Sequence, residues 1–365
     1  MHGKRRLVSV ATAVLAVATV ASGGLLAGPA ARAATAASPT FTIKDLGTLG
    51  GQNSYANAIN NSGQVVGSSE TASGQTHAFV WSNGTMTDLG TLGGTYSVAT
   101  DINNSGQVVG YSTNSAGQTR GFLWSNGTMT ALGTLGGTSS EARGISDSGV
   151  IVGSSTLASG DDRGFRLKNG TMETLGTLGT YSTAYDVDQS GDAVGVTDDS
   201  VYNDIKGFMW NAGTSGGSGS MDAVNDGLVA EAYAVANPLN AAGQTLDPVT
   251  GHYHAAYWWW NHTYFQLNDL GTLGGTESAA WSIGYASLPG QSAGYLTFAG
   301  SSDTASGDSH AWMIPPGQNT MVDMGTLTGA GNSFAHDVNT SAVAAGSSQV
   351  AAGGAYHAVT WTPQQ

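Results

Sequence analysis

The chain has 365 residues, a formal net charge of −14 at pH 7, no cysteine and 55 glycines. The negative charge argues against nucleic acid and anionic membranes as partners, because both attract basic surfaces. Without cysteine, neither disulfides nor thiolate metal sites hold the chain together. Branched and aromatic residues recur at fixed places, which excludes a disordered chain. The many glycines are typical of tight turns between short strands.

Residues 1–33 have the pattern of a secretory signal peptide. Three basic residues at positions 4 to 6 precede an apolar run from Leu7 to Val20, and Ala31-Arg32-Ala33 is a small-residue cleavage site. A membrane anchor is the alternative, but the run is short and rich in alanine and threonine. We therefore expect a secreted, extracellular protein with no membrane span. Cleavage after Ala33 leaves seven basic against 25 acidic side chains, a net charge of −18.

The rest of the chain is one segment repeated with variations. The repeats, here called units 1 to 7, begin near Asp45, Asp88, Ala131, Thr174, Asp222, Asp269 and Asp323. The first four starts are 43 residues apart, unit 5 is degraded, and unit 7 begins with a weaker copy of the motif. A fixed period in the forties is typical of repeat architectures.

Unit 1 predicts four short strands. Residues 55–59 and 64–67 flank the turn Asn60-Asn61-Ser62-Gly63, and residues 77–81 and 85–88 flank the hairpin turn Ser82-Asn83-Gly84. No helical periodicity is present. Four strands in each of several repeats are the pattern of a propeller blade.

The two ends of the chain predict closure of the repeat array. Unit 7 ends at Trp361, the counterpart of Trp81, and so lacks a fourth strand. The segment Phe41–Asp45 matches the fourth strand of unit 1 and can cover that open edge. We therefore predict an all-β fold over residues 34–365, a single seven-bladed β-propeller of four-stranded blades whose last blade is closed by the N-terminal strand. A β-solenoid is the alternative, but its repeats are usually shorter.

The repeat resembles that of the extracellular HAF family, which is named for the triplet seen here as His77-Ala78-Phe79. Units 1 and 2 also carry LGTLGG, INNSGQVVG and WSNGTMT, and the resemblance covers roughly 320 residues. It implies secretion and a bladed β fold, and it implies no particular reaction. Function therefore has to be argued from a site.

Two columns of equivalent positions hold in every unit. One is a small residue in the first strand, which fits where blades crowd near an axis: Ala56, Ala99, Ala142, Ala184, Ala232, Ala280 and Ala335. The other is a basic residue that opens the third strand: His77, Arg120, Arg163, Lys206, His254, His310 and His357. These bases could face a ligand. Because every unit repeats them, we favour a structural hydrogen bond from one blade to a loop carbonyl or carboxylate of the next.

A third column varies while its neighbours stay uniform: Asn57, Thr100, Arg143, Tyr185, Tyr233, Trp281 and His336. In propellers the first strand is innermost, so this column should rim the mouth of a central channel. Aromatic faces beside Arg and His suit a sugar or another polar ligand. We predict a ligand-binding crescent of Arg143, Tyr185, Tyr233, Trp281 and His336. The alternative is that these side chains are fillers between blades.

The residue after this column is Asp101, Asp186 or Asp337 in three of the units. Side chains alternate along a strand, so we expect these carboxylates on the opposite face from the crescent.

Two other motifs are less specific. The run Trp258-Trp259-Trp260-Asn261-His262 could be a sugar platform, a protein contact or loop packing. Asp186 to Asp192 has oxygen side chains at alternate positions, as in a calcium loop, but several ligands of a cage are missing. No nucleophile elbow, zinc-protease motif or phosphate loop is present in the sequence. We therefore predict neither a metal nor a cofactor.

Three functions fit these observations. The first is a secreted monomer that binds a glycan or another polar extracellular ligand at the channel mouth. The second is an extracellular polysaccharide lyase or hydrolase, in which Arg143 or Arg163 neutralises charge and Tyr185, Tyr233 or His336 transfers protons; its catalytic residues stay unassigned. The third is a structural envelope or coat protein. The variable column favours the first two, because a scaffold has less reason to diversify one position.

Overall fold

The computed structural model describes residues 39–199, 205–212, 220–224, 230–236, 240–260, 265–288, 291, 294–351 and 353–364. The signal-peptide pattern lies outside the described residues, as do Asn261, His262 and the side chain of Trp260. Throughout the described residues the regular elements are β-strands, without a helix, so the all-β prediction is confirmed. Accordingly, that part of the chain has no helix with the length and apolar character of a membrane span.

The strands of each repeat pair as antiparallel neighbours in chain order. Units 1 to 3 contain β2 (Gly50–Ile59), β3 (Val65–Thr71), β4 (Thr76–Ser82), β5 (Thr85–Asp88), β6 (Gly93–Ile102), β7 (Val108–Asn114), β8 (Thr119–Ser125), β9 (Thr128–Ala131), β10 (Gly136–Ile145), β11 (Ile151–Leu157), β12 (Asp162–Lys168) and β13 (Thr171–Gly176). Units 4 and 5 contain β14 (Ser182–Val187), β15 (Ala193–Asp198), β16 (Ile205–Asn211), β17 (Ser220–Ala223), β18 (Ala230–Ala236), β19 (Asn240–Leu246), β20 (Tyr253–Trp260) and β21 (Phe265–Gly271). Units 6 and 7 contain β22 (Gly274–Ala286), β23 (Tyr295–Thr304), β24 (Ser309–Ile314), β25 (Val322–Asp323), β26 (Ser333–Val338), β27 (Ala344–Gln349) and β28 (Tyr356–Pro363).

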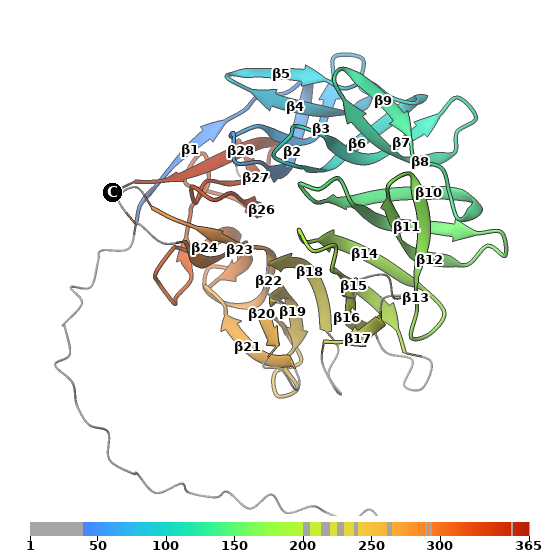
Figure 1. Ribbon diagram of the computed structural model, residues 1–365. Coiled ribbons are helices and arrows are strands. Elements are labelled where there is room, and N and C mark those ends of the chain that lie inside the picture. Colours follow the sequence, from blue (N-terminus) through green and yellow to red (C-terminus); the bar gives the residue numbers. More distant parts are fainter. Residues whose placement is uncertain are drawn as a thin grey trace, which may run out of the picture. The chain divides into compact units, whose positions relative to one another are not determined.

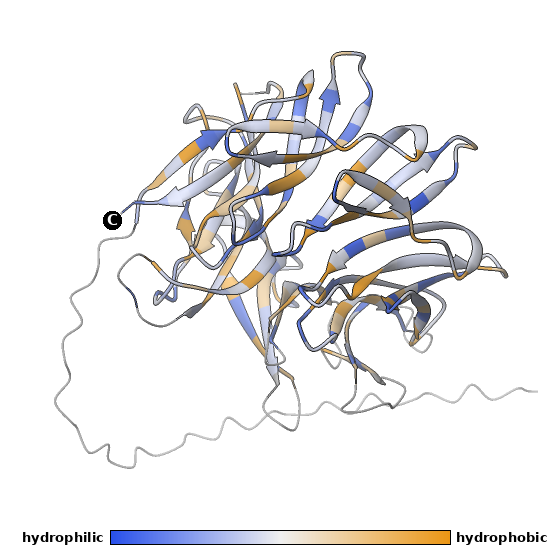
Figure 2. Cartoon of the chain, turned by 45° about the horizontal axis from the view of Figure 1, so that its top comes forward, coloured by the Kyte–Doolittle hydropathy of each residue, from blue (hydrophilic) through white to orange (hydrophobic). Residues whose placement is uncertain are grey.

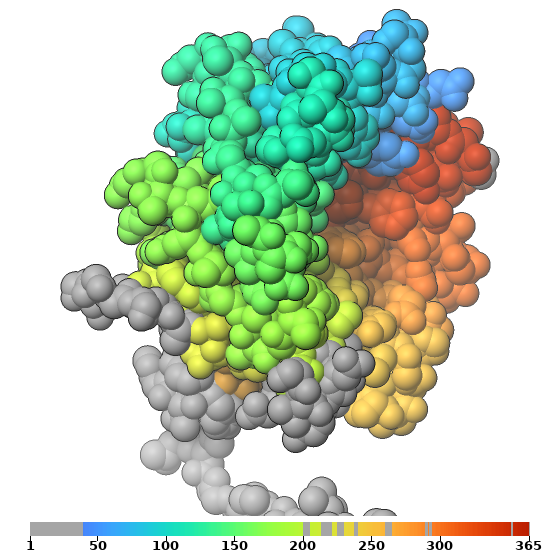
Figure 3. Space-filling model, turned by 90° about the vertical axis from the view of Figure 1, so that its right-hand side faces the viewer, coloured from blue at the N-terminus to red at the C-terminus, as the bar shows by residue number. Residues whose placement is uncertain are grey.

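The sheets follow one another around a central axis, so the fold is propeller-like (Figure 1). Units 1 and 2 share one eight-stranded sheet, joined by the single parallel pair Thr76↔Tyr96. The first strand of the described chain, β1 (Phe41–Asp45), pairs antiparallel with β28, from Phe41↔Pro363 to Asp45↔Val359. It therefore occupies the outer edge of the unit 7 sheet, and Figure 3 shows the C-terminal residues lying against the first strands.

A β-bulge interrupts the first strand of every unit. In unit 1 the register shifts between Ala56 and Ala58, which leaves Asn57 as the unpaired extra residue. Opposite the bulge stands Gly67, where an added Cβ would lie 1.9 Å from the carbonyl oxygen of Tyr55. The equivalent glycines, at 1.8 to 2.0 Å, are Gly110, Gly153, Gly195, Gly243, Gly300 and Gly346. The glycine of each second strand is therefore what allows the bulge to form.

The first strands also start earlier than the sequence predicts. In unit 1, β2 begins at Gly50 instead of Tyr55, because Gly51 approaches the neighbouring strand closely. A Cβ on Gly51 would lie 2.4 Å from the Cβ of Glu70, closer than side chains can pack. The paired glycines of LGTLGG thus belong partly to the strand and not only to the loop.

The core is a series of contacts between neighbouring units. All seven alanines of the small-residue column are fully buried, as their position near the axis requires. One cluster joins Val80 of unit 1 to Ile102 and Phe122 of unit 2. Another joins Phe79 of unit 1 to Ala358 of unit 7. Hydrophobic and hydrophilic stretches alternate along the strands (Figure 2). This is expected when each face of a sheet is covered by its neighbours over only part of its area.

The turns between the first and second strands link the units in a row. The backbone N–H of Asn61 donates to the side-chain oxygen of Asn104 at 2.9 Å, and that of Asn104 donates to Asp147 at 2.7 Å. Across the ends of the chain, the N–H of Thr340 donates to the side-chain oxygen of Asn61 at 3.0 Å. The second asparagine of the INNSGQ motif thus accepts a hydrogen bond from a backbone N–H in the equivalent turn of the preceding unit.

Candidate ligand site at the channel mouth

The variable column faces open space along the axis. A cavity of about 430 Å³ is lined by Asn57, Arg143, Tyr185, Glu231, Tyr233, Trp281 and His336. A second cavity, of about 160 Å³, shares six of these residues and adds the carboxylates of Asp101, Asp186 and Asp337. A third, of about 200 Å³, is lined by the same three carboxylates and by the turns of the opposite mouth. The three cavities therefore succeed one another along one channel.

The five predicted ligand-binding residues contact one another in unit order. The guanidinium of Arg143 lies 5.4 Å from the ring centroid of Tyr185. The rings of Tyr185 and Tyr233 meet edge to face at 5.7 Å, and Tyr233 stacks on Trp281 at 4.4 Å. The ring of His336 follows, nearly perpendicular to that of Trp281, with the two ring centroids 6.3 Å apart. These side chains form one continuous wall of the cavity, which we call the crescent.

Three members of the variable column also bind the next unit. The side chains of Asn57 and Thr100 donate to the carbonyl oxygens of Ala99 and Ala142 at 2.7 and 3.0 Å. His336 contacts the carbonyl oxygen of Ala56 through Nδ1 at 2.9 Å. Asn57 and Thr100 therefore fill the space between neighbouring units, as the alternative prediction states. In units 3 to 6 the residue at the same position belongs to the crescent.

His336 belongs to both groups. Burial lowers the pKa of its imidazole, which therefore stays neutral near pH 7. A carbonyl oxygen accepts only, so Nδ1 carries the proton and Nε2 remains a hydrogen-bond acceptor. The ring thus supplies the end of the crescent with an acceptor rather than a positive charge.

Two glutamates at the site were not identified from the sequence. The hydroxyl of Tyr233 donates to Oε2 of Glu231, which also accepts from Nε2 of Gln244 at 3.4 Å. Glu141 pairs with Arg143 at 2.7 Å, and both side chains are one-third exposed. Burial and the hydrogen bond to Glu231 raise the pKa of Tyr233, which keeps its phenol protonated. The sequence does carry a signal, since the position two residues before the variable column varies as well: Tyr55, Val98, Glu141, Thr183, Glu231, Ala279 and Phe334.

The prediction that Asp101, Asp186 and Asp337 point away from the crescent is wrong. All three line the channel next to it, because a bulge places two consecutive residues on one side of a strand. In each carboxylate, one oxygen accepts a hydrogen bond from the backbone N–H of the following residue in the same strand. The other oxygen accepts a hydrogen bond from a backbone N–H of the next unit. The acceptor–donor pairs across units are Asp101 with Ile145 N (2.7 Å), Asp186 with Val235 N (2.9 Å) and Asp337 with Ile59 N (2.8 Å).

Burial dominates the ionisation of these carboxylates. It raises the pKa of Asp186 to about 7 and that of Asp337 to about 6. Burial and the charge of Asp186 raise the pKa of Asp101 well above its usual range. The receiving units carry Ala58, Gly144 or Ala234 at the equivalent position, which leaves room for each carboxylate.

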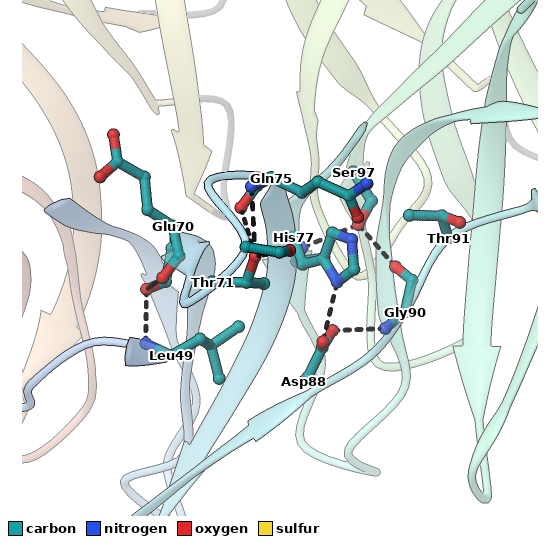
Figure 4. Close-up of polar contacts among 12 residues, drawn as sticks. Leu49, Glu70, Thr71, Gln75, His77, Asp88, Gly90, Thr91 and Ser97 are labelled. Carbon is teal, nitrogen blue, oxygen red and sulfur yellow. Dashed lines mark hydrogen bonds and ion pairs between the residues drawn. The ribbon is translucent and has the colours of Figure 1, made fainter. Parts of the chain in front are cut away.

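The column of bases that opens the third strands lies away from these cavities. Nδ1 of His77 contacts Asp88 at 2.8 Å, and Asp88 also accepts from the N–H of Gly90 (Figure 4). The same pair recurs as His254–Asp269, His310–Asp323 and His357–Asp45, at 2.8 to 3.0 Å. These bonds join the third and fourth strands of one sheet, so the expected bond between units is wrong for the histidines.

The arginines of that column do reach the next unit. Arg120 donates to the carbonyl oxygen of Thr138 and Arg163 to that of Thr180, the latter at 2.5 Å. Lys206 is buried. Where the base is Arg or Lys, the position equivalent to Asp88 is Ala131, Thr174 or Ala223. Histidine and aspartate therefore occur together in this repeat, and this pairing could have been read from the sequence.

The two remaining motifs lie outside the crescent. Trp258 is fully buried, and Trp259 is 37% exposed but lines none of the channel cavities. Asp188 accepts from the N–H groups of Ser190 and Asp192, so its loop is a closed turn. Within the described ranges, no group of three His, Cys, Asp or Glu side chains could hold a metal ion.

No family model matches the chain, and no curated protein does. The fold is similar to three solved structures, each with a TM-score of 0.41 or 0.42. TolB from Acinetobacter baumannii is 13% identical, and the match covers 75% of this chain and 66% of TolB. A triple arginine-to-alanine variant of AofleA from Arthrobotrys oligospora is 11% identical, with coverages of 78% and 90%. A gluconolactonase from Xanthomonas campestris is 11% identical, with coverages of 91% and 96%.

Proposed function

We propose that this protein is a secreted, closed seven-bladed β-propeller that binds a neutral saccharide at the mouth of its central channel. The fold proposal is supported by the bulge that recurs in every unit and by the pairing of β1 with β28. Closure is supported by the hydrogen bond of His336 to the carbonyl oxygen of Ala56 and by the one that Asp337 accepts from the N–H of Ile59. The pattern of residues 1–33 and the resemblance to HAF repeats support secretion.

The observation that carries the binding proposal is the crescent around one cavity. A volume of about 430 Å³ lies in the range of small-molecule sites. Its wall combines the rings of Tyr185, Tyr233 and Trp281 with polar groups that both donate and accept. Sugars have apolar ring faces and a hydroxyl at almost every carbon, so they match such a wall.

The charges around the cavity favour a neutral sugar over a uronate. The positive charge of Arg143 is already balanced by Glu141 at 2.7 Å. Glu231 lines the same cavity and would repel a ligand carboxylate. A hydroxyl can instead donate to Glu231 or to Nε2 of His336. Within the predicted class of a glycan or another polar ligand, the contacts therefore favour an uncharged one.

The enzyme alternative has less support. A lyase for uronates needs a free positive charge, whereas Arg143 is paired and Arg163 binds the carbonyl oxygen of Thr180. A hydrolase needs two available carboxylates, whereas both oxygens of Asp101 accept backbone N–H groups. Of the two glutamates at the site, Glu141 pairs with Arg143, and Oε2 of Glu231 accepts from Tyr233 and Gln244. The observed contacts therefore suit binding better than either reaction.

A glycan array and calorimetry on the chain from residue 34 onward test the proposal. Trp281→Ala should weaken saccharide binding by roughly 1–3 kcal/mol, the loss typical of an aromatic anchor. Trp259→Ala is the matched control, because it removes an exposed tryptophan outside the channel. Reducing ends and unsaturated uronates are assayed on the same panel, and their formation would favour the enzyme alternative. If no saccharide binds, the proposal is wrong.

A further inference from the structure

A second group of aromatic side chains lies beside the channel mouth, on units 7 and 1. Phe334 precedes the cavity-lining His336 by two residues on β26, and Tyr55 precedes Asn57 by two residues on β2. Residues two apart in a strand project to the same face. Phe334 and Tyr55 are therefore one step outward from the cavity along these two strands.

Tyr356 of β28 joins these two side chains into one surface. Its ring lies 5.8 Å from that of Tyr55 and 6.1 Å from that of Phe334, with interplanar angles of 30° and 38°. Tyr55 is 38% exposed. The three shallowly tilted rings, here called the outer patch, thus continue the aromatic lining beyond the His336 end of the crescent.

A structural role shared by all units does not account for the outer patch. The residues equivalent to Tyr55 and Phe334 in the other units are Val98, Glu141, Thr183, Glu231 and Ala279. None of these is aromatic, and the two glutamates are on units 3 and 5. The mouth therefore has an acidic side on units 3 and 5 and an aromatic side on units 7 and 1.

We propose that the site takes a saccharide chain rather than a single sugar. This inference rests on the proposed function. One sugar occupies the cavity against the crescent, and the next lies over the outer patch. Aromatic rings tolerate different sugar orientations, whereas the hydroxyl groups of Tyr55 and Tyr356 can bond to ring substituents. The cavity alone limits the ligand to a small molecule, whereas Tyr55 of the outer patch is exposed to solvent, so a chain lying over it can continue outward.

The test is the dependence of affinity on chain length, for the sugar that binds best on the glycan array. Calorimetry compares oligomers of one to six residues of that sugar. For the wild type, affinity should rise about tenfold from the monomer to the dimer or trimer, as expected for one added aromatic contact. Tyr55→Ala and Tyr356→Ala should remove this rise, and Tyr55→Phe should keep it because the ring remains.

Tyr285→Ala is the matched control. It removes a tyrosine that is 43% exposed and lines the opposite end of the channel, next to Asn61 and Asn104. This variant should show the same rise with chain length as the wild type.

The outcomes separate the two proposals. A wild type that binds monomer and oligomer equally well overturns the chain inference but leaves the saccharide site in place. Tyr55→Ala weakening the monomer as much as the oligomer would show that the outer patch is no separate subsite. Failure of every saccharide to bind overturns both proposals.

Discussion

The Oδ2 atom of Asp337 accepts a hydrogen bond of 2.8 Å from the backbone N–H of Ile59, 278 residues earlier in the chain. Asp101 of unit 2 binds Ile145 of unit 3 in the same way, at 2.7 Å. The contact between the last and first units is therefore built like a contact between consecutive ones. What differs at the ends of the chain is the origin of the outer strand, since β1 comes from the N-terminus.

Deleting residues 41–45 should lower the melting temperature sharply. The deletion removes β1, exposes the edge of β28 and takes away Asp45, the partner of His357. We expect a decrease of about 10 °C or more, corresponding to several kcal/mol for a chain of this size. Differential scanning calorimetry measures it, with deletion of residues 34–38 alone as the control. An unchanged melting temperature would contradict the role given to β1.

Replacing a glycine opposite a bulge should destabilise the fold more than replacing another strand glycine. In Gly110→Ala the new Cβ would lie 2.0 Å from the carbonyl oxygen of Val98, so the bulge would have to open. We expect a loss of about 3 kcal/mol in the free energy of unfolding. Gly284→Ala is the control, since its Cβ would meet nothing closer than 3.7 Å. Urea denaturation compares the two, and equal midpoints would refute the explanation.

The repeat made most of the fold predictable. A period of 43 residues, the Asn-Gly hairpin turns and the missing strand of unit 7 are all features of the sequence itself. The hairpin prediction agrees with the backbone, where Asn83 and Gly84 both have positive φ. The crescent was predictable because variation at one position stands out against uniform neighbours.

The bulge is the feature that sequence reasoning missed. Strict alternation places Asp337 opposite to His336, and only the extra residue in the strand brings both into the channel. Alternation along a strand carries no information about such an insertion. The glycine opposite the bulge is present in the sequence of every unit. Its role, however, follows only from how close an added Cβ would lie to a backbone carbonyl oxygen of the first strand. Glu231 was missed because the variation two positions earlier was not considered.

Stability should decrease as the pH rises through the range in which Asp186 and Asp337 lose their protons. Their pKa values of about 7 and 6 lie above the ordinary value of 3.8, so the folded state binds more protons than the unfolded state between about pH 4 and pH 7. This contribution is complete below the unfolded pKa and is lost as the pH rises through the folded pKa.

Asp186→Asn should therefore flatten the decrease in melting temperature between pH 5 and pH 8, by about 5 °C relative to the wild type. Asp247→Asn is the control, because hydrogen bonds to backbone N–H groups and to Thr250 lower the pKa of that exposed carboxylate below this range. Parallel curves for wild type and Asp186→Asn would show that the buried carboxylate does not titrate there.

Glu141 should set the charge selectivity of the site through its ion pair with Arg143. Arg143 lies over Tyr185 and is held by Glu141 at 2.7 Å, which offsets its attraction for a ligand carboxylate. Glu141→Gln keeps the size of the side chain and removes its charge. This substitution should raise the affinity for uronate oligomers relative to neutral ones by about tenfold, because an unpaired guanidinium binds carboxylates strongly.

The chain offers a close control for that experiment. Arg166 lies over Trp210 at 4.4 Å and pairs with Glu173, outside the channel cavities. Glu173→Gln therefore frees an arginine of the same kind without changing the charge at the crescent, and it should leave the preference between neutral and anionic sugars unchanged. Calorimetry at low and high salt compares the two variants, and the gain for uronates in Glu141→Gln should shrink at high salt because screening weakens it. If both variants gain equally, the effect comes from net charge, and Arg143 does not set selectivity at the cavity.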